Sequence, residues 1–123
     1  QSADEVTTPP ESSPGCQARE QMRERFRVAV TRMMDSLGVD ALVYPTWSNP
    51  PRLIGDLNTP HGDNSQVFSP LTGFPSITVP MGYTRNNALP AGITFFGRAW
   101  SEGKLIGLAY DYERVTRHRR APE

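Results

Sequence analysis

Cysteine and long apolar segments are scarce in this 123-residue chain. The single cysteine, Cys16, excludes an internal disulfide and a cysteine-rich zinc site. The two histidines, His61 and His118, are too few for a histidine-rich site, so we expect no metal. The longest apolar stretches, residues 105–110 and 41–44, fall far short of the roughly 18 residues that a membrane-spanning helix needs. We therefore expect no membrane span.

The chain also lacks an excess of either charge, because 13 Lys and Arg residues balance 13 Asp and Glu residues. A neutral chain has no overall field that would attract nucleic acid, so we expect no such partner. Basic residues at 117–120 suit the negative end of a helix, and a binding patch is the alternative. The sequence leaves the cellular compartment open.

Apolar residues are few for a chain of this length. They make up 37% of the sequence, and the mean hydropathy is −0.52. Two interpretations follow: a small, lightly packed domain, or a piece of a larger fold whose other part completes the core.

The first third of the chain divides into two segments. Residues 1–16 hold three prolines and one sizeable apolar side chain, Val6, which predicts a disordered lead or linker. From Gln17, apolar residues recur every three or four positions, which predicts an amphipathic helix that ends at Gly38. The apolar positions of this helix are Met22, Phe26, Val30, Met33 or Met34, and Leu37.

The middle of the chain is rich in proline and glycine and predicts short elements. Residues 40–44 form an apolar run closed by a proline, which predicts a buried strand. Residues 65–72 predict a helical turn, capped by Asp63 or Asn64 and stopped by Gly73.

Two strands and a helix are predicted for the last third. The β-branched runs 76–79 and 91–96 predict strands joined by a turn at residues 82–90. The last helix is predicted to begin at Ser101, a good N-cap, and to end in the basic residues 117–120.

One pattern typical of a catalytic nucleophile is present. Ser101 and Lys104 match Ser-x-x-Lys, in which an amine one helical turn after a hydroxyl can accept its proton. The companion motifs Ser-Asp-Asn and Lys-Thr-Gly are absent, and a serine at a helix start already serves as a cap. We assign no catalytic role to either residue.

Four phrases carry a resemblance when they are taken together and in order. They are Asp40-Ala-Leu-Val-Tyr-Pro-Thr46, Gly73-Phe-Pro-Ser-Ile-Thr-Val-Pro-Met-Gly82, Pro90-Ala-Gly-Ile-Thr-Phe-Phe-Gly97, and Ser101-Glu102 with Ala109-Tyr-Asp-Tyr-Glu113. Over about residues 19–122 the chain resembles the C-terminal part of the amidase signature family. The resemblance implies an α/β fold with a mixed sheet flanked by helices, in the order helix, strand, loops, short helix, two strands, helix. Residues 17–123 would then be the C-terminal part of an amidase-like domain.

Members of that family are serine hydrolases that act on amide bonds. The resemblance implies a catalytic lysine and two serines that lie upstream of the matching region, and no residue of this chain matches them. We therefore expect a segment without catalytic residues, inactive alone, that works with the N-terminal part of the same fold on a small-molecule amide, without a cofactor. The alternative is a non-catalytic remnant or accessory interaction module of the same family.

The resemblance also implies residues of the substrate-pocket wall. Thr46 and Trp47 follow the first strand at its carboxyl end, where open α/β sheets place ligands. Asp63, followed by Asn64, matches by position an aspartate that binds the substrate's amino group in glutamine-using, tRNA-dependent members. Phe68 is the fifth candidate. The alternatives are a turn cap for Asp63 and ordinary packing for Trp47 and Phe68.

Overall fold

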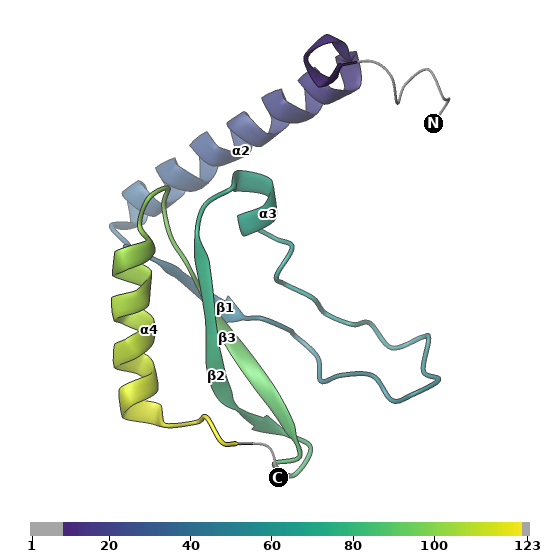
Figure 1. Ribbon diagram of the computed structural model, residues 1–123, viewed down its shortest axis with the longest axis vertical. Coiled ribbons are helices and arrows are strands. Elements are labelled where there is room, and N and C mark those ends of the chain that lie inside the picture. Colours follow the sequence, from purple (N-terminus) through teal and green to yellow (C-terminus); the bar gives the residue numbers. More distant parts are fainter. Residues whose placement is uncertain (1–8, 122–123) are drawn as a thin grey trace.

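The computed structural model describes residues 9–121, and residues 1–8 and 122–123 lie outside the described part. Seven elements follow one another along the chain (Figure 1). They are η1 (Pro10–Ser12), α2 (Pro14–Leu37), β1 (Leu42–Pro45), α3 (Ser69–Thr72), β2 (Ser76–Thr84), β3 (Leu89–Phe96) and α4 (Glu102–Thr116). The predicted α/β class and element order are confirmed. Among the described residues, no helix is both long and apolar enough to cross a membrane.

The three described strands form one sheet in the order β1-β3-β2, and both pairings are antiparallel. β2 and β3 form the predicted hairpin, with Thr84 opposite Leu89 at its closed end. Both strands are longer than the β-branched runs indicated. A bulge at Met81 shifts the register of β2, because Pro80 and Gly82 pair with consecutive residues of β3.

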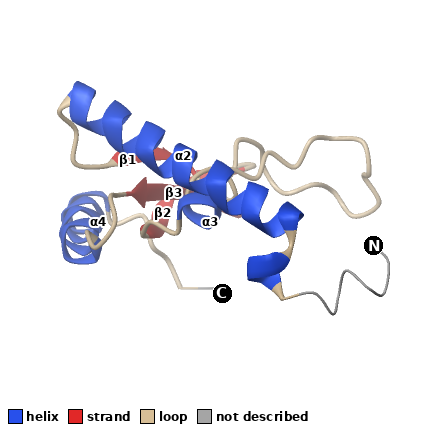
Figure 2. Ribbon diagram, turned by 90° about the horizontal axis from the view of Figure 1, so that it is seen from above, coloured by secondary structure: helices blue, strands red, loops and turns tan. Residues whose placement is uncertain are grey.

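Helices cover both faces of the sheet, as predicted (Figure 2). Successive side chains of a strand point to opposite faces, so Phe95 and Phe96 of β3 enter different cores. On one face Phe95 packs with Val79, Leu105 and Ala109, which joins α4 to the hairpin. On the other face Phe96 packs with Val30 and Met34 of α2.

Two arginines of α2 hold the short helix α3 in place. The Nε of Arg27 donates to the carbonyl of Thr72 at 2.7 Å, and the Nε of Arg23 donates to that of Leu71 at 3.1 Å. The last carbonyls of a helix lack partners within the helix, so these guanidinium groups satisfy them. Thr72 itself is buried and returns its hydroxyl to the carbonyl of Phe68.

The first long helix starts earlier than the sequence predicts. α2 begins at Pro14 rather than Gln17, and η1 precedes it. Proline suits a first helical position because its fixed φ is already helical, and the Gln17 side chain donates to the carbonyl of Glu11 at 2.6 Å. Residues 9–16 are therefore largely helical instead of a disordered lead. The predicted stop at Gly38 is confirmed, with φ at 62°.

The short helix is shorter than predicted and has a different start. α3 begins at Ser69, because Pro70 supplies the fixed φ of a first helical turn. Phe68 occupies the N-cap position without a side-chain hydrogen bond, so neither Asp63 nor Asn64 caps this helix. Gly73 ends it with φ at 72°, as predicted.

The first strand is exposed rather than buried. β1 pairs with β3 alone and lies at an edge of the described sheet, and Val43 is 51% exposed. Pro45 is part of the strand, which an edge position permits because its missing N–H breaks no second ladder. The apolar run fits a buried strand equally well, so the sequence alone does not separate the two cases.

Ser101 lies at the N-cap position of α4 but does not cap it with its side chain. The hydroxyl donates to the carbonyl of Arg98 at 2.7 Å instead. Gly97 makes this turn possible, since a Cβ there would collide with the hydroxyl of Ser101. Lys104 turns away and pairs with Asp40, with Nζ and Oδ1 2.6 Å apart.

The basic residues after α4 do more than end the helix. α4 stops at Thr116, and Arg117 takes the left-handed conformation. The guanidinium of Arg120 stacks on the ring of Tyr83, 3.8 Å from its centroid, and the Arg120 N–H donates to the Tyr83 hydroxyl. The tail thus crosses from the end of α4 to the hairpin (Figure 1).

Adjacent methionines of α2 allow a matched test of this packing. Met34 is fully buried, whereas Met33 is 38% exposed. We expect Met34→Ala to lower the free energy of unfolding by about 2–5 kcal/mol because it leaves a cavity. Met33→Ala should change it by no more than about 0.5 kcal/mol. Urea denaturation of both variants measures the difference, and equal losses would contradict the described orientation of α2.

Candidate functional site

The chain beyond β1 keeps pairing after the strand itself ends. The N–H of Thr46 donates to the carbonyl of Gly92 at 2.8 Å, which continues the contact with β3. Residues 46–48 then pair with residues 62–64 through a bridge between Trp47 and Asp63. This short ladder closes a loop at residues 49–61 and brings four of the five predicted site residues together.

Gly62 makes the closure of this loop possible. Its φ is +69°, and a Cβ at this position would lie 2.9 Å from the Asn49 side-chain nitrogen and 3.0 Å from its backbone nitrogen. The N–H of Ser48 donates to the Gly62 carbonyl at 2.8 Å. Only glycine satisfies both the left-handed conformation and the close approach without strain.

Asn64 fastens the two sides of the ladder. Its side-chain nitrogen donates to the carbonyl of Pro45 at 2.8 Å and to the hydroxyl of Ser48 at 2.8 Å. Its backbone N–H donates to the carbonyl of Thr46 at 2.9 Å. Asn64 therefore fixes the base of the loop.

Asp63 accepts hydrogen bonds from the residue that follows the ladder. Its Oδ1 accepts the Ser65 hydroxyl at 2.6 Å and the Ser65 N–H at 2.9 Å. The Ser65 side chain is the main reason that the pKa of Asp63 is lowered, because these bonds favour the ionised carboxylate. The arrangement is a local turn cap, which is the alternative that the sequence left open for this residue.

Thr46 belongs to a row of hydroxyls that crosses all three strands. Its Oγ1 lies 2.7 Å from that of Thr94, which in turn lies 2.9 Å from that of Thr78. Gly92 leaves room for the row, because a Cβ there would lie 3.0 Å from the Thr46 hydroxyl. Thr46 thus anchors the end of β1 to the centre of the sheet.

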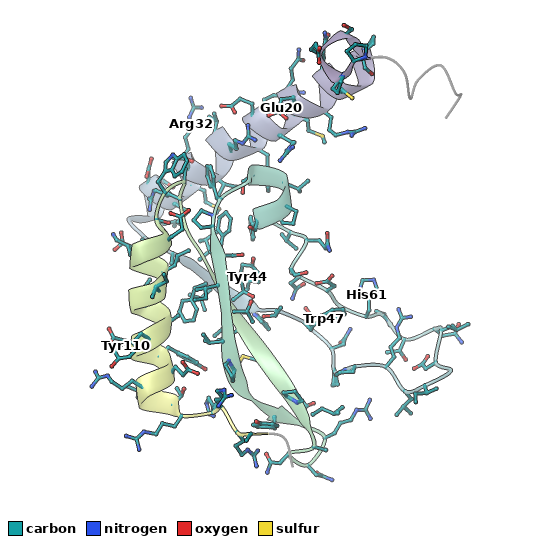
Figure 3. All side chains as sticks on the ribbon, viewed as in Figure 1. Glu20, Arg32, Tyr44, Trp47, His61 and Tyr110 are labelled. Carbon is teal, nitrogen blue, oxygen red and sulfur yellow. The ribbon has the colours of Figure 1, made fainter. Side chains whose placement is uncertain are left out.

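Trp47 lies at the edge of an open groove of about 700 Å³ between the loop and the far end of the hairpin. Its side chain is 48% exposed, and its ring meets the ring of His61 edge to face, with the centroids 5.9 Å apart (Figure 3). The groove is lined by Pro45, Trp47, Ser48, Asn49, Pro50, Pro51, Arg52, His61, Met81, Thr84, Pro90, Ala91 and Gly92.

His61 is fixed from the other side by the backbone. Its Nδ1 accepts the N–H of Asp63 at 3.1 Å. A ring nitrogen that accepts a hydrogen bond carries no proton, so the neutral ring bears its proton on Nε2. The sequence indicated a solvated turn for His61, and nothing in its local pattern shows the contact with Trp47.

Phe68 lies away from the groove in an aromatic cluster. Its ring packs against those of Phe26, Tyr44 and Phe96, with centroid distances of 6.2, 5.7 and 5.2 Å. In the same cluster the Tyr44 hydroxyl is buried without a hydrogen-bond partner among the described residues, and burial raises its pKa. Phe68 therefore joins α2, α3 and the sheet.

The five predicted residues thus have different surroundings. Trp47 lines the groove, Thr46, Asp63 and Asn64 build the ladder beneath the loop, and Phe68 packs in the core. The sequence missed the contributions of Met81 and the prolines, which become neighbours only through the hairpin. Within residues 9–121, no group of three or more His, Cys, Asp or Glu side chains is placed to hold a metal ion.

Comparison with known proteins identifies the family. Residues 6–106 match the Amidase family. The chain belongs to the amidase family. The resemblance drawn from the four phrases is confirmed, and the match begins earlier and ends earlier than those phrases suggested.

Curated relatives and a solved structure agree with this assignment. The chain is 34% identical to a glutamyl-tRNA(Gln) amidotransferase of Pseudomonas savastanoi over 91 residues, 69% of this chain and 18% of that protein. It is 31% identical to a probable amidase of Arabidopsis thaliana over 106 residues, 86% of this chain and 17% of that protein. The fold matches the crystal structure of an amidase family protein from Bacillus anthracis with a TM-score of 0.69 at 22% identity, over 98% of this chain and 20% of that one. The chain spans about a fifth of the length of these proteins.

The turn at Asp63 predicts a measurable pKa change. In Ser65→Ala we expect the pKa of Asp63 to rise toward the ordinary aspartate value of about 3.9, because the strongest hydrogen bond to the carboxylate is lost. In the wild type this turn is stabilised above the ordinary pKa and loses that stabilisation as the pH falls through the lowered value. Carboxyl chemical shifts followed against pH measure the change.

Asp56 serves as the internal control for that titration. Its pKa is lowered chiefly by the Thr59 side chain and also by the N–H groups of Thr59 and Asn58, none of which Ser65→Ala removes. An equal rise at both aspartates would show a general loss of structure and would contradict the assigned cause.

Proposed function

We propose that this chain is the C-terminal part of an amide-hydrolysing domain, to which it contributes scaffold and one wall of the substrate groove. The nucleophile and its base would come from the N-terminal part of the same fold. Membership of the amidase family supports the reaction class. The small share of the relatives' length that the chain spans supports the division between wall and catalytic group.

The hydroxyl and the amine of the Ser-x-x-Lys pattern are both engaged elsewhere. The hydroxyl of Ser101 donates to the Arg98 carbonyl, and the amine of Lys104 pairs with Asp40. A serine nucleophile needs a base within hydrogen-bond reach to take its proton. These contacts support a segment without a nucleophile of its own.

The half-exposed ring of Trp47 is the observation that carries the proposed role. It lies at the carboxyl end of β1, on a loop fixed by the ladder of residues 46–48 and 62–64. An aromatic side chain that lines a groove and is held by its neighbours is typical of a binding wall. Ordinary packing would instead bury most of that ring, as happens to Phe96.

Exposed apolar side chains favour a segment of a larger fold over a free accessory module. The described residues with the most exposed large apolar side chains are Leu37, Leu53, Ile54, Leu57, Trp100 and Val115. So many exposed apolar groups on a small domain are typical of surfaces that another part of a protein covers.

A graft into a relative tests the proposed role. The matched segment of the Arabidopsis probable amidase is replaced by the corresponding residues of this chain, and hydrolysis is measured on an amide that the intact relative cleaves. We expect the graft to keep activity that the relative loses when the segment is deleted, since the wall is supplied and the catalytic group is retained. The 123-residue chain alone should hydrolyse no amide above the buffer rate.

Ser101→Ala in the graft is the matched control for the alternative nucleophile. We expect unchanged kcat, because that hydroxyl only closes the turn before α4. A folded graft without activity, or amide hydrolysis by the isolated chain that disappears in Ser101→Ala, would refute the proposed role.

Association of the isolated chain separates the two interpretations of the family match. A segment that normally packs against the rest of its domain should self-associate at micromolar concentrations through its exposed apolar groups. Sedimentation velocity over a concentration series measures this. A monodisperse monomer at every concentration would support the accessory module instead.

A further inference from the structure

The groove beside Trp47 has a lining whose chemistry restricts what it accepts. Its walls are dominated by four prolines, Trp47, Met81 and Ala91, which offer apolar surface and few hydrogen bonds. Its volume of about 700 Å³ lies within the range of about 300–1,000 Å³ that is typical of small-molecule sites. A flat apolar group therefore fits this surface better than an extended polar one.

The Trp47 ring is held in position before any ligand arrives. His61 packs its ring edge against the indole, and His61 is itself held by the N–H of Asp63. Trp47 is also tied through its backbone to Asp63. A ring that is fixed and yet half exposed gives a second ring a surface to stack on at little cost in side-chain entropy.

The charge of the lining has one sign. Arg52 is its only permanently charged residue, and no Asp or Glu lines the groove. The Arg52 guanidinium forms no ion pair with a described residue. Asp56 lies outside the lining and feels the charge of Arg52 only after its hydrogen bonds from Thr59 and Asn58. A cationic ligand would meet a like charge here without a carboxylate to offset it.

We propose that the groove binds an aromatic group that carries no positive charge, stacked on Trp47, and that this group belongs to the amide substrate. The identification of the ligand as part of a substrate rests on the function proposed above. The site itself rests on the lining, the fixed indole and the single cation. It assigns aromatic amides, and not amides with an ammonium group near the ring, as the preferred substrate class.

Three probes with the same ring test the assignment on the 123-residue chain. Phenylacetamide is neutral, phenylacetate is an anion and 2-phenylethylammonium is a cation. We expect ligand-observed NMR to show binding of the first two, with the cation weaker by about tenfold because of Arg52. Trp47→Ala should weaken phenylacetamide by about three- to tenfold through the loss of stacking.

Two variants serve as controls. Trp100→Ala removes the other tryptophan, which is 93% exposed and lies outside the groove lining, and should leave all three affinities unchanged. Arg52→Gln should bring the anion and the cation to similar affinity while phenylacetamide is little affected. Binding that is absent, that survives Trp47→Ala, or that is equal for the cation overturns the inference. An inactive graft that still binds phenylacetamide would refute the proposed function and leave the binding site standing.

Discussion

The alternation of two phenylalanines on the central strand is the constraint on which the rest of the structure depends. β3 is the only described strand with a neighbour on both sides, and it sends Phe95 to α4 and Phe96 to α2. A slip of one residue would exchange the two faces and empty both cores at once. The buried hydroxyl of Thr94, which contacts Thr46 on one side and Thr78 on the other, opposes such a slip, because its partners exist only in this register.

The groove inherits its geometry from the same strand. Gly92 of β3 accepts the N–H of Thr46, and this bond carries the pairing past the end of β1 to the ladder with residues 62–64. Trp47 therefore emerges from a short piece of paired backbone and not from a free loop. The opposite wall of the groove comes from the end of the hairpin, where the bulge at Met81 re-aims β2. Both walls are thus referred to one strand, which makes the shape of the groove a property of the sheet.

Local patterns predicted the parts of the fold that local physics decides. The period of α2, its stop at Gly38 and the hairpin each follow from residues that are close in sequence. The choice between Met33 and Met34, the exposure of Val43 and the start of α3 depend on what packs against each element, and one-dimensional periodicity contains no such information. Ser101 shows the same limit, because its hydroxyl prefers the carbonyl of Arg98 to the cap that its position suggests.

The site was harder to predict for a related reason. The resemblance to a family pointed to Asp63 and Asn64, and the structure does place them against Trp47. Their polar groups, however, are engaged by Ser65, Pro45 and Ser48, so their clearest contribution is to hold the loop that carries the tryptophan. The groove draws its lining from three segments that are remote in sequence, and no spacing rule joins them. On the proposed function, recognition and chemistry would therefore be encoded in different parts of the polypeptide. The recognition part can keep its fold through β3 while the groove residues vary, since neither Trp47 nor Arg52 belongs to the two hydrophobic cores.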